Sequence, residues 1–158
     1  MFMTDLGFEV ERAVDATHAS NLVQARLIEV LSGIGRDYLD IVALPFRKSY
    51  TEAQIAGTFE ALENARLEGH IRFLALRFCS SLFACGAFWR LHDGFDLLWL
   101  PQNGDTDRPT DLLQAMAKER RVGQIFDAVE TTQPQPDSVQ LVTVTSSAEV
   151  DTWVGMVA

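Results

Sequence analysis

The stretch EGHIRFLAL, residues 68–76, carries the clearest structural signal in this sequence. Gly69 suits the left-handed position that commonly follows the last turn of a helix. The mostly apolar run after it, residues 70–76, is short and nearly continuous, which is typical of a strand buried on both faces. The stretch therefore predicts a helix that ends just before a buried strand begins, and the rest of the chain extends this alternation in both directions.

On the N-terminal side the same alternation continues. Thr51 and Gln54 have the spacing of a capping box and predict the start of the helix that ends in the stretch above. Residues 38–44 form another short apolar run, stopped by a proline, and predict a second buried strand. Before this strand, apolar residues recur with helical spacing between Ser20 and Gly33 and predict a helix. We expect Ser20 to be its N-cap.

On the C-terminal side the pattern predicts three more strands and three more helices. They are a helix capped by Ser80 or Ser81 and reaching residue 91, a strand over 95–100, a helix that starts near Pro109, strands over 123–129 and 139–144, and a helix that starts at Ser146 or Ser147 and ends near residue 155. The segment between the last two strands, residues 131–137, is too short for a helix and is predicted to be a loop.

One alternative stays open in the middle of the chain, where residues 83–100 could pair as a β-hairpin across His92-Asp93-Gly94. Repeats of strand, helix and strand with nearly continuous apolar strands are instead the pattern of a parallel α/β sheet. We therefore predict an α/β fold with about five parallel βα units, built as one domain over residues 1–158.

Composition narrows the class of protein. The chain has 158 residues, 47% of them hydrophobic and 22% charged, which is enough apolar material for one core. A net charge of −9 argues against nucleic acid or an anionic membrane as partner, since both attract basic surfaces. The two cysteines, Cys79 and Cys85, form neither a disulfide framework nor a four-ligand zinc site. We expect reduced thiols in a cytoplasmic protein without signal peptide or membrane span.

Four stretches, in this order, resemble the carboxy-terminal half of an aldo-keto reductase. IGRDYLDI, residues 34–41, is similar to the family's LGxDYIDL, which enters the fourth barrel strand. The most specific stretch, residues 61–76, resembles ALxxLxxxGKIRxIGVSNFS. LLQAMAKERRVG, residues 112–123, resembles LLxxAKERGIGVI before the seventh strand, and VTVTSSAE, residues 142–149, resembles the last strand and the start of the last helix. The resemblance implies a TIM barrel of which this chain has room for about the last five of eight units.

The departures from the family's pattern remove its chemistry. The catalytic Asp, Tyr and Lys of the family would lie in the missing front half, and the position of its catalytic His is occupied by Pro45, which has no proton to exchange. The Ser-Asn pair that holds the nicotinamide corresponds to Arg77 and Phe78, and the following Gln corresponds to Trp99. Residues 145–158 contain no basic residue to hold the NADP 2′-phosphate. We therefore expect no cofactor, no catalytic residue and no metal.

A candidate ligand face remains at the carboxyl ends of the predicted strands. Phe78, Trp99 and Phe126 are either packing residues or the wall of an aromatic pocket for a planar ligand. Arg47, Lys48 and Arg77 are either solvated charges or a site for a phosphate or carboxylate. Cys79 is either an inert or an activated thiol. The whole face comprises Pro45, Phe46, Arg47, Lys48, Arg77, Phe78, Cys79, Trp99, Asn103, Phe126, Thr145 and Ser146.

Five strands cannot close a barrel of this family, because diameter and stagger depend on strand number. The domain is therefore predicted to be a half barrel or an open twisted sheet, whose inner side chains need cover. We expect that cover from a second copy or from a larger complex, so the predicted function is that of a non-catalytic subunit acting through protein association, structural or regulatory. The alternative is a small-molecule or nucleotide-binding oxidoreductase component whose site a partner chain completes. The inner residues in need of cover are expected among Leu44, Leu76, Trp99 and Val144.

Overall fold

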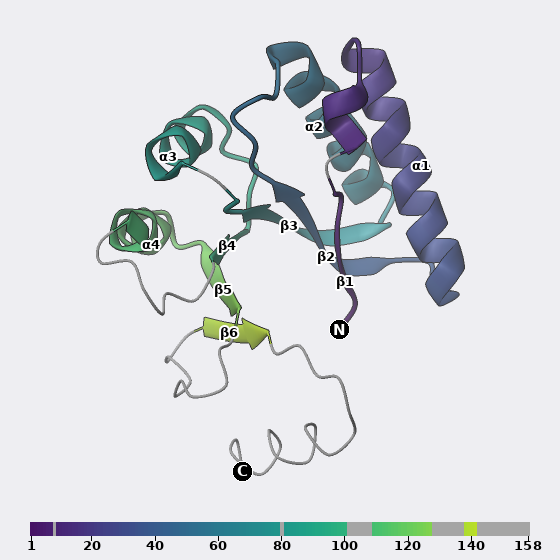
Figure 1. Ribbon diagram of the computed structural model, residues 1–158. Coiled ribbons are helices and arrows are strands. Elements are labelled where there is room, and N and C mark those ends of the chain that lie inside the picture. The colour runs from purple at the N-terminus through teal and green to yellow at the C-terminus, as the bar shows by residue number, and fades with distance from the viewer. Residues whose placement is uncertain (8, 80, 101–108, 128–137, 142–158) are drawn as a thin grey trace, which may run out of the picture.

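The computed structural model describes residues 1–7, 9–79, 81–100, 109–127 and 138–141. In these residues strands and helices alternate along the chain (Figure 1). The elements are β1 (Met3–Asp5), the 3-10 helix η1 (Glu9–Arg12), α1 (Ala16–Ile34), β2 (Leu39–Pro45), α2 (Glu52–Leu67), β3 (Ile71–Arg77), α3 (Leu82–Leu91), β4 (Leu97–Leu100), α4 (Pro109–Arg120), β5 (Gly123–Asp127) and β6 (Ser138–Leu141).

The six strands form one sheet, whose order follows the sequence from β1 to β6. Every neighbouring pair is parallel. Among the described residues β1 and β6 each have a single neighbouring strand, so the sheet is open. The predicted parallel α/β fold is confirmed. The hairpin alternative is wrong, because α3 fills the middle of that segment and β4 runs parallel to β3.

Two local predictions at the N-terminal end are corrected. The first helix begins at Ala16, four residues before the predicted cap, because the Asp15 side chain accepts a hydrogen bond from the His18 backbone N–H at 2.8 Å. Ser20 lies inside the helix and is buried. In addition, β1 was not predicted. Three residues are too few to show a pattern, and β1 is held by its pairing with β2.

The second helix follows the prediction closely. Thr51 and Gln54 form the capping box in both directions, with hydrogen bonds of 3.2 and 2.9 Å. Gly69 follows the helix with a φ of 81°, the left-handed conformation expected of it. The helix packs so closely on α1 that a Cβ built on Gly57 would lie 1.9 Å from the carbonyl oxygen of Ala16. Glycine is thus required at this crossing of α1 and α2.

The third and fourth helices agree with the prediction in place. Ser81 occupies the N-cap position of α3, but its side chain makes no capping hydrogen bond. Pro109 is the first residue of α4, where its missing N–H costs no intrahelical bond. The predicted loop over residues 131–137 and the predicted last helix lie outside the described residues.

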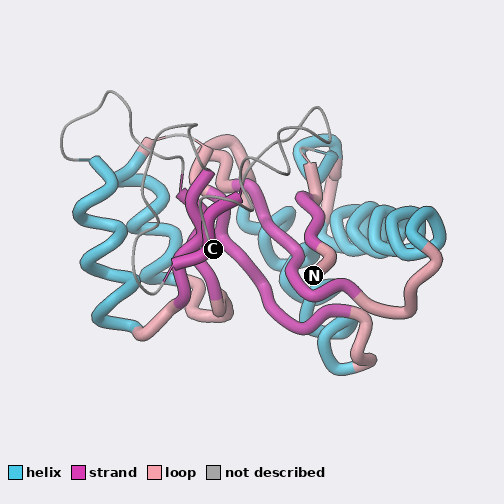
Figure 2. Tube along the Cα trace, turned by 90° about the horizontal axis from the view of Figure 1, so that it is seen from below, coloured by secondary structure: helices cyan, strands magenta, loops and turns pink. Residues whose placement is uncertain are grey.

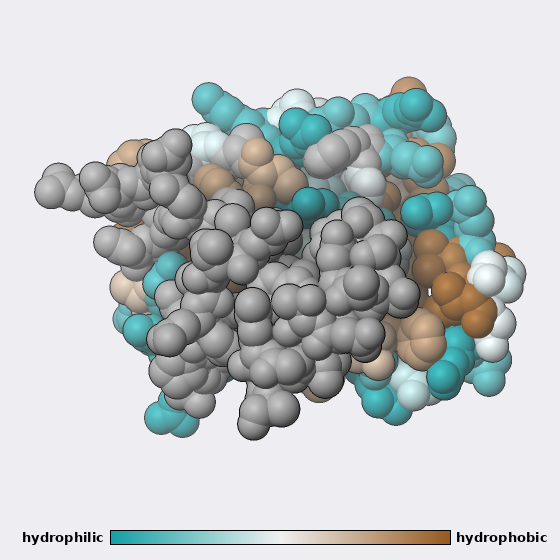
Figure 3. All heavy atoms as spheres, turned by 60° about the horizontal axis from the view of Figure 1, so that its bottom comes forward, coloured by the Kyte–Doolittle hydropathy of each residue, from teal (hydrophilic) through white to brown (hydrophobic). Residues whose placement is uncertain are grey.

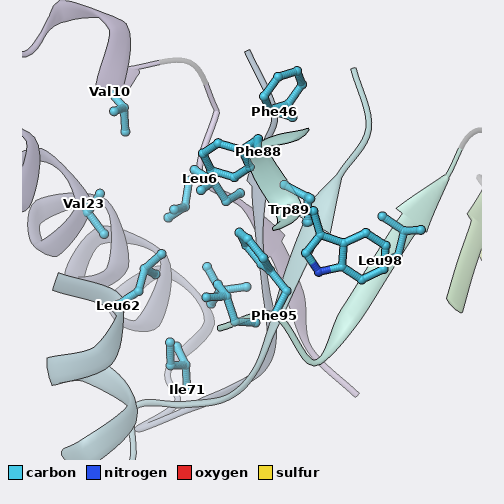
Figure 4. Close-up of a cluster of buried hydrophobic side chains, with 14 of the residues drawn as sticks. Leu6, Val10, Val23, Phe46, Leu62, Ile71, Phe88, Trp89, Phe95 and Leu98 are labelled. Carbon is cyan, nitrogen blue, oxygen red and sulfur yellow. The ribbon is translucent and has the colours of Figure 1, made fainter. Parts of the chain in front are cut away.

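The main core lies between the sheet and the helices, which line one face of the curved sheet (Figures 1 and 2). Leu62 of α2, Phe88 and Trp89 of α3, and Leu98 of β4 are buried there, in one cluster with Phe95 (Figure 4). At roughly 25 cal/mol per Å² of apolar surface removed from water, this layer is the dominant stabilising contribution.

A second, smaller cluster occupies the opposite, inner face of the sheet. Trp99 belongs to it as expected and is buried, but Leu44 and Leu76 do not, since both point into the helix-side core. The prediction that these two leucines lie on the inner face and need cover was wrong. Successive side chains of a strand point to opposite faces of the sheet, and these two point toward the helices. Val144 lies outside the described residues. The buried members of the inner cluster are Ile41, Ala43, Ala75, Trp99 and Ile125.

Candidate functional site

The carboxyl ends of β2, β3 and β4 meet at one edge of the sheet, the predicted ligand face. β2 ends at Pro45, β3 ends at Arg77, and Trp99 of β4 lies in register with Arg77. Pairing continues beyond the ends, because Phe46 N–H donates to the Arg77 carbonyl and Phe78 N–H donates to the Trp99 carbonyl, both at 2.8 Å. Pro45 is buried and carries no ionisable group, so this position cannot act as a general acid or base.

Arg77 is the central charged residue of this edge. Its Nη1 lies 2.6 Å from Asp5 Oδ2 at the end of β1, an ion pair that crosses over β2. Its guanidinium carbon lies 4.5 Å from the ring centre of Trp99, a cation–π contact. Because the Arg77 charge is matched by a carboxylate, the predicted phosphate or carboxylate site would require breaking this pair. The geometry favours Arg77 as a cross-link between β1, β3 and β4.

A second polar group lies where η1 meets the loop between β2 and α2. Ser49 Oγ donates to Glu11 Oε1 at 2.7 Å, and Arg47 Nε lies 3.8 Å from the same oxygen. The hydroxyl of Tyr50 is buried and has no hydrogen-bond partner among the described residues. Burial, with a smaller contribution from the carboxylate of Glu11, raises the pKa of Tyr50 well above its ordinary value. Its hydroxyl therefore stays a protonated donor.

The candidate aromatic pocket is not formed. Phe126 is buried in the helix-side core, and Phe78 packs against the same core, whereas Trp99 lies on the inner face. Phe46 is also on the helix side, with its ring centre 5.3 Å from that of Phe88. Phe78 and Phe126 are thus separated from Trp99 by the sheet, and the packing interpretation holds for them.

The remaining predicted residues are scattered. Lys48 is exposed and Cys79 is half-buried. Asn103, Thr145 and Ser146 lie outside the described residues. Within the described ranges, no three His, Cys, Asp or Glu side chains lie together as metal ligands, and no helix is long and apolar enough to cross a membrane.

Sequence reasoning missed Asp5, Glu11 and Tyr50. Asp5 is 72 positions from Arg77, so no local spacing joins them, and only the parallel register of β1 with β2 brings them together. Glu11 lies in a 3-10 helix of four residues, which is too short to show a pattern of apolar residues in the sequence. The one available signal was Tyr50, a tyrosine directly before the capping box and therefore at the carboxyl edge of the preceding strand.

The fold and this edge define a class: an open set of parallel βα units with the architecture of an incomplete (β/α) barrel. Solved structures of aldo-keto reductases share it, at identities that establish the fold alone. The aldo-keto reductase AKR11C1 from Bacillus halodurans in its holo form superposes with a TM-score of 0.72 at 14% identity, over 98% of this chain and 65% of that chain.

Other solved structures agree. A putative 2,5-diketo-D-gluconic acid reductase B gives a TM-score of 0.67 at 15% identity, over 94% of this chain and 59% of that one. The Bombyx mori aldo-keto reductase AKR2E4, in complex with NADP, gives 0.57 at 15% identity, over 87% of this chain and 48% of that one. This chain thus spans about two thirds or less of these reductases. No protein-family model and no curated protein matches the sequence.

Proposed function

We propose that this chain is a non-catalytic, aldo-keto-reductase-like subunit that acts through protein association. The observation that carries the proposal is the carboxyl edge of the sheet. Pro45 ends β2 without a proton to transfer, and the Arg77 guanidinium is engaged by Asp5 and Trp99. A reductase needs a proton donor at the carbonyl it reduces and an open site for the nicotinamide. Among the described strand-end residues Pro45, Arg77 and Leu100, none carries a hydroxyl or an imidazole, and the protonated Tyr50 hydroxyl beside this edge is buried.

The test is an assay of NADPH oxidation by the purified chain with a panel of aldehydes and ketones. We expect no turnover above the rate without protein. The matched control is Arg77→Leu, which releases Asp5 and uncovers the Trp99 ring without adding a proton donor, and it should be equally inactive. Turnover that survives repurification, scales with protein concentration and responds to Arg77→Leu would refute the non-catalytic assignment.

A second candidate function is favoured by Tyr50. A buried hydroxyl without a partner costs about 1–3 kcal/mol, which a ligand atom can recover by accepting its hydrogen bond. This supports a small-molecule or nucleotide site completed by a partner chain. Thermal shift with NADP(H) and NAD(H) tests it, because a ligand at a hundred times its dissociation constant stabilises by about 2.7 kcal/mol. A shift lost in Tyr50→Phe would favour this function, and the absence of any shift would leave association as the function.

A further inference from the structure

The inner face of the sheet holds apolar side chains that are buried although no described helix lies over them. Ala75 and Ile125 are at most 1% exposed, and Trp99 is 9% exposed. Every described apolar side chain that packs against this inner cluster belongs to a strand of the same sheet. The described helices line the opposite face (Figures 1 and 2). The cover of the inner cluster therefore comes from outside these helices.

Phe73 shows how a side chain of this face fares without cover. It lies on the same face of β3 as Ala75, two residues further on, because side chains alternate between the faces of a strand. β3 has a neighbouring strand on each side, yet Phe73 is 49% exposed. Apolar side chains also reach the surface on the side of the molecule that Figure 3 turns forward. The cover thus reaches Trp99 and Ile125 and ends before Phe73.

Three longer stretches of the chain lie outside the described residues, and their compositions differ. Residues 101–108, PQNGDTDR, are polar, and residues 128–137, AVETTQPQPD, are nearly so. Residues 142–158, VTVTSSAEVDTWVGMVA, follow β6 directly and are rich in valine. Since the hydrophobic effect favours contact between apolar surfaces, residues 142–158 are the stretch whose composition suits an apolar face.

The apolar residues of this stretch also have a helical spacing. Val150, Trp153 and Val154 stand at i, i+3 and i+4, which places them on one stripe of a helix. The last helix predicted from the sequence falls here. Thr152 would lie on the side of that helix away from the stripe, and the acidic residue Asp151 would lie beside the stripe. A helix with this pattern requires an apolar surface against which its stripe can pack.

The stretch is long enough to cross the inner face. β6 and β2 are four strand spacings apart, which is about 19 Å at about 4.8 Å per spacing. The predicted helix over residues 146–155 is about 15 Å long, and the link over residues 142–145 adds up to about 13 Å. All strands are parallel, so the stretch leaves β6 at the carboxyl edge of the sheet. Phe73 lies toward the opposite, amino edge, which agrees with its exposure.

We propose that residues 142–158, the cover segment, fold back over the inner face of the sheet and pack Trp153 and the neighbouring valines against Trp99 and Ile125. The cover segment then occupies the face that a second copy would otherwise have to cover. A protein partner reaches this face only by displacing the cover segment, which makes the contact autoinhibitory. The proposal does not depend on the proposed function, because these side chains need cover in a catalytic and in a non-catalytic chain alike.

Photocrosslinking within the purified full chain tests the proposal. The crosslinker p-benzoylphenylalanine replaces Trp153, and in a matched control it replaces the adjacent Thr152. Adducts are mapped by mass spectrometry across about a hundredfold range of protein concentration, since a dimer dissociates on dilution by mass action. A second pair of variants, Trp153→Asp and Thr152→Asp, is examined with anilinonaphthalene sulfonate, a dye that binds exposed apolar surface, and their melting temperatures report whether they fold.

We expect the crosslinker at position 153, and not at position 152, to form an adduct with β4 or β5 of the same chain at every concentration. Trp153→Asp should raise the dye fluorescence severalfold, because a carboxylate is costly to bury, whereas Thr152→Asp should leave it unchanged. An adduct between two copies would assign the cover to a second copy and overturn the proposal. An adduct with the helices, no adduct, or equal dye fluorescence in the two folded variants would overturn it as well. If Trp153→Asp does not fold, the crosslink alone decides.

Discussion

At the scale of single residues, Cys85 of α3 shows how strongly the helix-side core excludes water. Its side chain is fully buried. Burial, with a smaller contribution from nearby Cys79, raises the pKa of Cys85 from 9.0 to about 12. A raised pKa lowers the thiolate fraction at neutral pH, and the thiolate is the reactive form. Cys85 is therefore a packing residue of the core and not a nucleophile.

This shift predicts how stability depends on pH. The folded pKa of Cys85 lies above the unfolded one, so its contribution is fully present below about pH 9 and is lost as pH rises toward about 12. Urea unfolding at about pH 7 and about pH 10 should show a fall in the free energy of unfolding. The fall should be smaller in Cys85→Ala, although that variant starts less stable because it loses a buried group. Equal falls in both proteins would contradict the assignment. The raised pKa of Tyr50 also makes the free energy of unfolding fall as pH rises. Tyr50→Phe removes this second contribution and is therefore the matched control, which separates the effect of Tyr50 from that of Cys85.

At the scale of elements, the crossing of α1 and α2 depends on Gly57. Gly57→Ala forces a methyl group against the Ala16 backbone, which cannot move as a side-chain tip could. We expect a loss of about 1–3 kcal/mol in the free energy of unfolding, measured with urea. Gly33→Ala is the control, because nothing lies within 4 Å of its Cβ position, and it should stabilise α1 by about 0.5–1 kcal/mol. A Gly57→Ala protein as stable as the wild type would show that the helices are further apart.

The elements that the sequence predicts well are those with local causes. The helix after the capping box at Thr51 and the strands of the two short apolar runs, β2 and β3, all formed within about one residue of the prediction. The start of α1 was predicted wrongly because residues 16–19 lack an apolar stripe. The strand β1 was not predicted because its formation depends on pairing with β2. The site was harder still. Asp5 and Arg77 are 72 positions apart in the sequence, so no local sequence spacing predicts their contact. The parallel register of β1, β2 and β3 brings them together.

At the scale of the whole molecule, an open parallel sheet should not be equally stable across its width. β2 pairs on both sides, with β1 and β3, and α1 and α2 cover its helix-side face. β1 has three residues, one neighbouring strand and an outer edge that no described residue covers. Local opening of a parallel edge strand breaks fewer hydrogen bonds and exposes less apolar surface than opening of an interior strand.

Hydrogen exchange measures this gradient directly. In the isolated chain we expect the amides of β2 and β3 to exchange slowest, near the rate set by global unfolding, and those of β1 to exchange at least about a hundredfold faster. The outward Met3 amide of β1 should exchange faster than the amide of Leu6, directly after β1, which donates to Ala43 O. Gly57→Ala serves as the control, since a global loss of stability speeds exchange in β2 and leaves the order unchanged. Protection of Met3 equal to that of β2 in a monomer would contradict this gradient, because it would mean that the chain covers its own β1 edge.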